Sequence, residues 1–298
     1  MDSPFAHKAL VFSQRHFSAL LRPVQSFVAA TQYFLLDLWW AIKGYRKPPD
    51  EDVRLVSDNV TFIFKSFERQ KQAKALYRSI QRFYPGTRVV IADDSSQPLD
   101  LTGDGLTVIQ MPFNSGLSKG LNLALEKVET PFLMRMDDDE LLTRHINIAD
   151  ELRFLESHPI VDLVGFPCID AAKSFTTRKR VKAYFKHSMR EAPKALIIPH
   201  GTHIDNNHVV LGKVTNIFVA RTESIRKVGW DDNIRMIDHH DFFFRAAGIL
   251  VSTLSVNGVI FHNHNYFDPK YNHYHSDCKG DVQYIRQTRY RHLAGKGT

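Results

Sequence analysis

Short apolar segments alternate with segments of helical periodicity between about residue 58 and residue 265. Runs of about four to eight apolar residues are typical of buried strands, and apolar positions that recur every three or four residues are typical of helices. The predicted strands are 60–64, 88–92, 106–111, 132–136, 161–166, 216–220 and 259–261, and the predicted helices are 70–83, 116–128, 148–155, 222–228 and 242–248. This alternation predicts an α/β fold with a mostly parallel central sheet and helices on both faces.

An N-terminal segment, residues 1–50, has a different pattern. Apolar residues recur at helical spacing over residues 17–42, and Pro23 suits the first turn of a helix. The densest apolar stretch, 27–42, contains Asp37 and falls short of the roughly 20 residues that a membrane-spanning helix needs. We therefore predict an amphipathic helix followed by a linker at 47–52, and we expect no cleavable signal peptide.

Two environments suit the helix at 17–42. Basic residues flank it and Trp39 and Trp40 lie near its end, a combination typical of a helix that lies peripherally in the cytoplasmic membrane interface. Alternatively, the helix packs on the main domain or on a second subunit of an oligomer, and the scarcity of positive charge on its polar side favours this alternative. Residues 51–298 are predicted to form the main domain, with 171–215 as an insertion and 266–298 as a C-terminal extension.

Composition narrows the class of protein. The 298 residues, 43% of them hydrophobic, are enough for one large α/β domain or two small ones. The net charge of +7 indicates an anionic partner such as a nucleotide, a phosphate-bearing substrate or a membrane surface. Nucleic acid is not expected, since there is no zinc-finger spacing and no long basic run. The two cysteines, Cys168 and Cys278, form no disulfide framework and favour a reducing compartment, so we expect a cytoplasmic protein.

A run of acids follows the predicted strand at 132–136: Asp137, Asp138 and Asp139. Adjacent carboxylates repel one another, a repulsion that a cation relieves, and their oxygens suit Mg²⁺ or Mn²⁺. An ion held there can stabilise a phosphate-rich leaving group. Taken alone, the triplet is explained equally well as a polar turn before a helix N-terminus. The carboxyl ends of neighbouring parallel strands meet at one edge of a sheet, so the acids at 93–94 are expected to face the same cleft.

Five segments, in order, resemble the motifs of family 2-like glycosyltransferases with the GT-A fold. These segments are 61–69, 90–96, 114–122, 137–139 and 229–232 with 238–245. In turn they resemble the opening strand, the second strand that contacts uridine, the N-x-G-x-x-x-x-x-N segment, the metal-binding D-x-D, and the acceptor-side segment with its catalytic acid. The acidic triplet and Asp241-Phe242-Phe243 also resemble the β-1,4-N-acetylgalactosaminyltransferase branch.

The resemblance implies roles for particular side chains. The residues expected to contact a nucleotide-sugar are Ser66, Glu68, Arg69, Asp93, Asp94, Gly116, Lys119, Asn122, Asp137 and Asp138. Asp137 and Asp139 point the same way in an extended segment, so either or both are expected to hold Mn²⁺ or Mg²⁺, with His262 or His264 completing the metal shell. Alternatively, these residues have purely structural roles: Asp93 and Asp94 cap a turn, and Lys119 is a solvated surface lysine. A separate zinc site is a further alternative, built from His262, His264, His273, His275 and Cys278.

Transfer to a hydroxyl needs a base, which the resemblance places near the start of the last predicted helix. Asp241 is the first candidate and Asp238 the second. Many relatives read Glu-Asp-x-Asp where this chain reads Asp238-His239-His240-Asp241, so His239 occupies the usual position of the base in that register. Alternatively, Asp238 caps the helix and Asp241 serves its first turn.

These features predict a metal-dependent GT-A-like (Rossmann-like) glycosyltransferase, a hexosyl- or N-acetylhexosaminyl-transferase. It is expected to move a sugar from a nucleotide-sugar, a UDP-sugar, to a hydroxyl of a glycan or lipid-linked acceptor, and the resemblance implies inversion. A nucleotidyltransferase acting on sugar phosphates is one alternative, but residues 65–69 lack the glycine-rich phosphate loop that it usually needs. A non-catalytic relative that binds glycan or scaffolds an assembly is the other, and the intact acids disfavour it.

Overall fold

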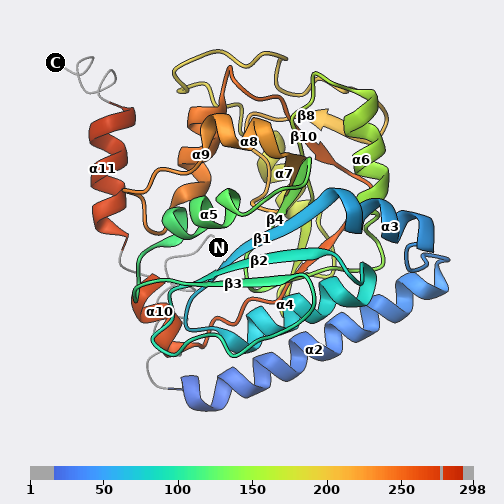
Figure 1. Ribbon diagram of the computed structural model, residues 1–298, viewed down its shortest axis with the longest axis vertical. Coiled ribbons are helices and arrows are strands. Elements are labelled where there is room, and N and C mark those ends of the chain that lie inside the picture. Colours follow the sequence, from blue (N-terminus) through green and yellow to red (C-terminus); the bar gives the residue numbers. More distant parts are fainter. Residues whose placement is uncertain (1–16, 276–277, 291–298) are drawn as a thin grey trace.

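The computed structural model describes residues 17–275 and 278–290. Two sheets form its frame (Figure 1). The strands of the large sheet are β1 (Val60–Ser66), β2 (Arg88–Asp93), β3 (Leu106–Gln110), β4 (Phe132–Arg135), β6 (Leu163–Gly165), β8 (His208–Val210), β9 (Phe218–Arg221) and β10 (Ser252–Ser255). They are ordered β3-β2-β1-β4-β9-β6-β10-β8, and all run in one direction except β9 and β8. A smaller sheet has the order β5-β11-β7, with β5 at Glu140–Leu141, β7 at Cys168–Asp170 and β11 at Ile260–His262.

Helices cover both faces of the large sheet, because alternate residues of each central strand point to opposite sides. On β1, Phe62 and Phe64 pack with α3 (Asp50–Asn59), α4 (Gln70–Phe83) and α6 (Ile148–Ser157). Ile63 belongs to the opposite core, with α5 (Leu117–Glu126), α8 (Thr222–Val228) and α9 (Asp238–Ala246). The remaining helices are α2 (Ser18–Ile42), α7 (Arg178–Phe185), α10 (Pro269–His275) and α11 (Lys279–Arg289).

The N-terminal helix α2 runs along one side of the molecule and packs on the small sheet (Figure 1). Ala29, Leu36 and Trp40 form a third apolar cluster with residues of β5, β7 and β11. Asp37 lies on the same side of the helix, where it accepts hydrogen bonds from Arg82 at 2.9 Å and from Arg144 at 2.8 Å. Among the described helices, none combines the length and the apolar character that a bilayer crossing requires.

The predicted α/β class, with its mostly parallel sheet, its helices on both faces and its N-terminal helix, is confirmed. The structure adds the direction or the sheet of two predicted strands and corrects the end of the predicted linker. The strand predicted at 216–220 runs antiparallel as β9, and the one at 259–261 pairs in the small sheet as β11. The predicted linker ends early, since α3 begins at Asp50 and three acids occupy its first turn, where they complement the helix dipole. The limits given for the insertion and the C-terminal extension stay a prediction.

Candidate active site

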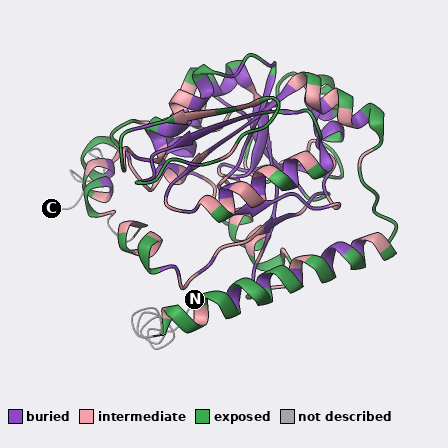
Figure 2. Cartoon of the chain, turned by 60° about the horizontal axis from the view of Figure 1, so that its bottom comes forward, coloured by how far each residue is buried: buried purple, intermediate pink, exposed green. Residues whose placement is uncertain are grey.

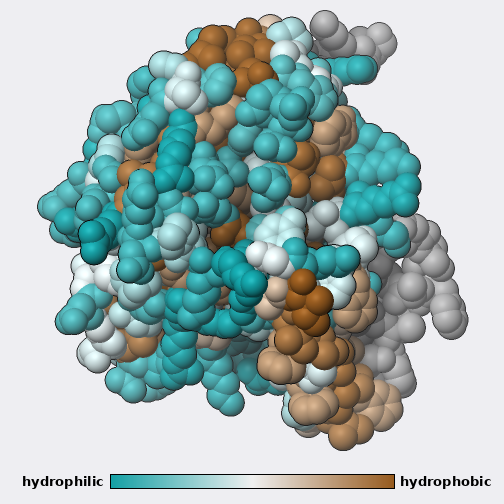
Figure 3. All heavy atoms as spheres, turned by 90° about the vertical axis from the view of Figure 1, so that its right-hand side faces the viewer, coloured by the Kyte–Doolittle hydropathy of each residue, from teal (hydrophilic) through white to brown (hydrophobic). Residues whose placement is uncertain are grey.

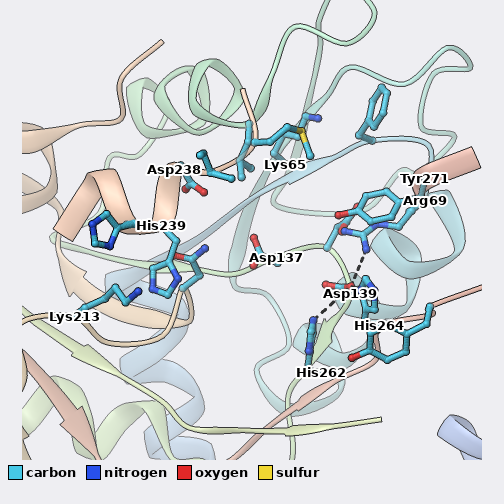
Figure 4. A pocket seen from close by; sticks show the side chains of 18 residues that line it. Lys65, Arg69, Asp137, Asp139, Lys213, Asp238, His239, His262, His264 and Tyr271 are labelled. Carbon is cyan, nitrogen blue, oxygen red and sulfur yellow. Dashed lines mark hydrogen bonds and ion pairs between the residues drawn. The ribbon is translucent and has the colours of Figure 1, made fainter. Parts of the chain in front are cut away.

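A cavity of about 500 Å³ opens at the carboxyl ends of β1 and β4 (Figure 4). Its walls also come from the start of α9, the end of β11 and the helix α10. The predicted site residues that line it are Arg69, Asp137, Asp138, Asp139, Asp238, His239, His262 and His264. Segments far apart in the sequence therefore bring acids, histidines and one arginine to a single hollow.

The first cluster in the cavity surrounds the Asp139 carboxylate. Its Oδ2 lies 2.9 Å from Nδ1 of His264 and 3.6 Å from Nε2 of His262, and it accepts a hydrogen bond from Arg69 at 2.7 Å. One ligand atom from each of Asp139, His262 and His264 can lie within 4.8 Å of the other two. The carboxylate is a ligand of the kind that suits Mn²⁺, and the two imidazoles are ligands typical of divalent transition metals.

The electrostatics of this cluster favour a cation. Burial raises the pKa of Asp139, but Arg69 and His262 outweigh burial and hold the pKa well below its usual range, so the carboxylate stays ionised. Burial lowers the pKa of His262, yet Asp139 and Asp170 outweigh that effect and raise the pKa to about 10. The site therefore attracts positive charge strongly, and a metal ion would take the place of that proton.

The other two acids of the triplet have different surroundings. Asp138 is buried and pairs with Arg69; its Oδ2 has no hydrogen-bond partner among the described residues. Burial raises the pKa of Asp138 to about 7, although Arg69 opposes the shift. Asp137 pairs with Arg135 at 2.7 Å and lies between Asp238 and the metal cluster in Figure 4. Asp137 and Asp139 were both expected to hold metal. The two histidines lie beside Asp139 and not beside Asp137.

Other potential ligands extend the cluster away from the cavity. Within the described residues, a second group shares His262 with the first and adds Cys168 and Asp170. Asp170 is already paired with Arg180 and with Nδ1 of His262. The alternative zinc site is not formed by the side chains that can be seen. His273 and Cys278 belong to neither group, and the side chain of His275 lies outside the described residues.

The opposite wall of the cavity is the start of α9. The Asp238 carboxylate is buried, with Oδ2 3.5 Å from Arg135 Nη2, and burial raises its pKa to about 6. Nε2 of His239 donates a hydrogen bond of 2.6 Å to the Val214 carbonyl. Burial lowers the pKa of His239 to about 3, so the imidazole is neutral. The structure does not bring Asp241 to the cavity, because that carboxylate is held by two arginines.

Those two arginines are Arg245, at 2.7 Å, and Arg289, at 2.6 Å. Arg289 belongs to α11, so the pair joins the C-terminal helix to α9. This partner set explains why Asp241 faces away from the hollow that contains Asp238.

The acids at the end of β2 lie behind the cavity wall. Asp93 accepts hydrogen bonds from Ser95 Oγ at 2.6 Å and Leu99 N at 2.8 Å, which makes it a turn cap. Asp94 is buried against Lys65, 2.6 Å away, and Lys65 itself lines the cavity. Asp94 is therefore one side chain removed from the hollow.

The remaining expected nucleotide contacts also lie off the cavity. Glu68 pairs with Lys270 and accepts from the Ser96 amide at 2.7 Å. Asn122 hydrogen-bonds to the 230–232 turn. The hydroxyl of Ser66 is buried, and the amide of Gly116 donates a hydrogen bond to Asp94. Lys119 is exposed to solvent.

Several lining residues were not singled out from the sequence. Lys213 comes from the end of the insertion and Asn216 from the residue that follows it, and Tyr266 and Tyr271 come from the C-terminal extension. The Tyr271 ring lies 3.8 Å from the Arg69 guanidinium carbon. The available signal was the density of tyrosines and histidines at 262–275. Nothing in the basic insertion marked Lys213.

Comparison with solved structures defines the class of fold. Residues 1–349 of TarS from S. aureus match with a TM-score of 0.52 at 17% sequence identity, over 69% of this chain and 60% of that chain. TarS has also been solved in complex with UDP and with UDP-GlcNAc. The fold is GT-A-like.

Sequence comparison adds the family. Human β-1,4 N-acetylgalactosaminyltransferase 1 is 34% identical over 199 residues, covering 65% of this chain and 37% of the relative. Mouse β-1,4 N-acetylgalactosaminyltransferase 2 is 30% identical over 230 residues, covering 76% and 43%. This chain therefore spans less than half the length of these relatives. Residues 61–240 match the model of glycosyl transferase family 2, and the chain belongs to that family.

Proposed function

We propose that the protein is a metal-dependent glycosyltransferase that moves a sugar from a UDP-sugar to a hydroxyl of a glycan or lipid-linked acceptor, with inversion. The family supports sugar transfer, and the UDP-GlcNAc complex of TarS supports this class of donor. The names of the curated relatives favour an N-acetylhexosaminyl group. One observation carries the proposal: the cation-favouring cluster and the buried acid Asp238 line opposite walls of the same cavity.

The cluster wall is assigned to the donor diphosphate. Asp139, His262 and His264 would hold Mn²⁺ or Mg²⁺, and the bound ion would act as a Lewis acid toward the leaving diphosphate. Arg69 and Lys65, both in the cavity wall, add positive charge beside it. Because Asp139 is ionised and buried, its attraction for a cation is little weakened by water.

The α9 wall is assigned to the acceptor, with Asp238 as the base. The carboxylate faces the cavity, and a pKa of about 6 suits proton transfer near neutral pH. His239 is a weaker candidate, because its Nε2–H is engaged by the Val214 carbonyl and its pKa is about 3. Asp241 is a weaker candidate because two arginines hold it outside the cavity.

We place the reaction in a reducing compartment such as the cytoplasm. Both cysteines are free thiols: Cys168 is buried and Cys278 is partly exposed. A chain of this size without a disulfide is typical of such a compartment.

Release of UDP from a panel of UDP-hexoses and UDP-N-acetylhexosamines tests the proposal. We expect release that EDTA abolishes and Mn²⁺ restores, and an Asp139→Ala protein that is at least about 100-fold slower. Asp100→Asn, a change at a carboxylate that is 95% exposed, is the matched control and should retain full activity. Pyrophosphate release would indicate a nucleotidyltransferase instead. Absence of turnover and of nucleotide binding across the panel would leave only a non-catalytic role.

A further inference from the structure

The helix α2 has two different faces. The face toward the domain carries its buried residues: Gln25, Ala29, Gln32, Leu36 and Trp40, spaced three or four apart, and Asp37 beside them. The opposite face is exposed and apolar over the length of the helix, and its most exposed large side chains are Leu20, Phe27, Phe34 and Ile42, each exposed by 64% or more. Figure 2 shows this mostly exposed helix at the edge of the molecule. At 1.5 Å per residue its 25 residues make a stripe about 37 Å long.

Charge is distributed unevenly around this stripe. The one acid of the helix, Asp37, points inward to Arg82 and Arg144, so the outer face of α2 carries no negative charge. Three exposed basic residues follow the helix directly: Lys43, Arg46 and Lys47. Trp39 is half exposed at the same end, with the Lys43 ammonium 5.6 Å from its ring. An apolar stripe that ends in tryptophan and a basic cluster matches a helix lying at a lipid headgroup boundary.

A second copy of the chain fits this face less well. In a symmetric pair, the basic cluster at 43–47 would meet either its own copy or the N-terminal end of the partner's α2, which carries the positive end of a helix dipole. The described outer face of α2 offers no acid to balance that charge. An anionic lipid surface supplies both the apolar boundary and the negative charge.

We infer that α2 lies flat in the interface of an anionic membrane, with Phe27 and Phe34 among the acyl chains and the 43–47 cluster among the headgroups. Figure 3 shows apolar surface gathered at the lower edge of the molecule. A groove of about 720 Å³ runs between α2 and α4, and His264 lines both this groove and the active-site cavity. The groove therefore connects the domain-facing side of α2, opposite the apolar stripe, with the wall of the cavity. Access to a lipid-linked acceptor rests on the proposed function, whereas membrane binding does not.

Vesicle flotation of the full chain tests the inference. The protein should float with phosphatidylcholine vesicles that contain phosphatidylglycerol and bind pure phosphatidylcholine more weakly. Phe27→Glu with Phe34→Glu should weaken binding at least about tenfold, because two apolar anchors are lost. The matched control, Ile160→Glu with Ile197→Glu, places the same charges at exposed apolar positions away from α2 and should bind like the wild type.

A charge variant separates lipid from protein partners. Replacing Lys43, Arg46 and Lys47 by glutamine should weaken binding to the anionic vesicles by about 100-fold and remove most of its salt dependence. Failure of the wild type to float would overturn the inference. So would a dimer, seen by light scattering, that Phe27→Glu with Phe34→Glu converts to monomer. UDP release by these variants in solution should equal that of the wild type. A variant that fails to float but still releases UDP has lost membrane binding and not its activity.

Discussion

Asp238 combines two opposing influences on a single carboxyl group. Burial and the nearby Asp137 disfavour its ionised form, whereas the Arg135 guanidinium favours it. The resulting pKa of about 6 lies above the ordinary value for an aspartate. An acid in this position holds a proton in mildly acidic solution and releases it near neutrality.

The activity should therefore fall in mildly acid solution. A base must be deprotonated to accept the acceptor's proton, so we expect kcat/KM to halve near pH 6 and to fall about tenfold per unit below it. The measurement is a pH–rate profile of the wild type, Asp238→Asn and Asp241→Asn. Asp238→Asn should lose about 10²- to 10⁴-fold in rate. Asp241→Asn should still lose kcat/KM below pH 6 as the wild type does. If this fall were absent in Asp241→Asn and present in Asp238→Asn, the assignment of the base to Asp238 would be wrong.

The sequence limited the candidates for the base to a few neighbouring residues but could not rank them by their access to the cavity. Asp238 and Asp241 lie less than one helical turn apart on α9, and both are acids in its first turn. What separates them is the pair of arginines that holds Asp241: Arg245, which is four residues away, and Arg289, which lies 48 positions along the chain. Such a distant partner leaves no local pattern in the sequence. The same reason applies to Asp94, whose carboxylate is covered by Lys65.

At the scale of elements, α11 acts as a clamp on the loop before α9. Asp281 in its first turn is buried and accepts hydrogen bonds from three successive amides, those of Arg235, Met236 and Ile237, at 2.7–3.2 Å. Met236 and Ile237 line the cavity, and Asp238 follows them. The helix thus holds this wall of the cavity from behind, without lining the cavity itself.

Loosening this clamp should affect turnover. Asp281→Asn replaces a charged acceptor by a neutral amide, so we expect a loss of about 1–3 kcal/mol in the free energy of unfolding. The loop should then hold Asp238 less firmly, and kcat should fall about tenfold with KM for the UDP-sugar little changed. Steady-state kinetics and urea unfolding measure the two effects. An unchanged kcat in a destabilised protein would restrict α11 to a purely structural role.

The elements themselves were predicted unevenly, for physical reasons. The helix α4 matches its predicted range, because its apolar positions keep helical spacing and it ends before the Pro85-Gly86 turn. The strands β5 and β7 are two and three residues long and carry too few side chains to show a period. The antiparallel direction of β9 could not be predicted either, because a strand buried on both faces has a similar apolar sequence in either direction.

At the scale of the whole molecule, the cavity exists only in the folded chain, since its walls come from segments between Lys65 and Tyr271. A ligand that binds this cavity stabilises the native state and not the unfolded chain. At a concentration about 100 times its Kd, UDP should add about 2.7 kcal/mol, which corresponds to roughly 5–10 °C in Tm. Thermal melts with UDP, with and without Mn²⁺, measure this shift. Asp139→Ala should abolish the part that depends on Mn²⁺, and an equal shift in that variant would show that the ion binds elsewhere.

The N-terminal helix α2 also contacts the segment that contains His264. Gln25 donates a hydrogen bond to the His264 carbonyl at 2.9 Å and accepts one from the Tyr266 amide at 2.9 Å. Asn265, between them, donates to the Arg22 carbonyl and to Ser26. These three consecutive residues at the cavity are thus bonded to α2, and Tyr266 also accepts a hydrogen bond from Asn272 of α10 at 2.8 Å. A displacement of α2 would reach the imidazole of His264 through its own main chain, so on the two proposals above we expect membrane docking to change the affinity for the ion.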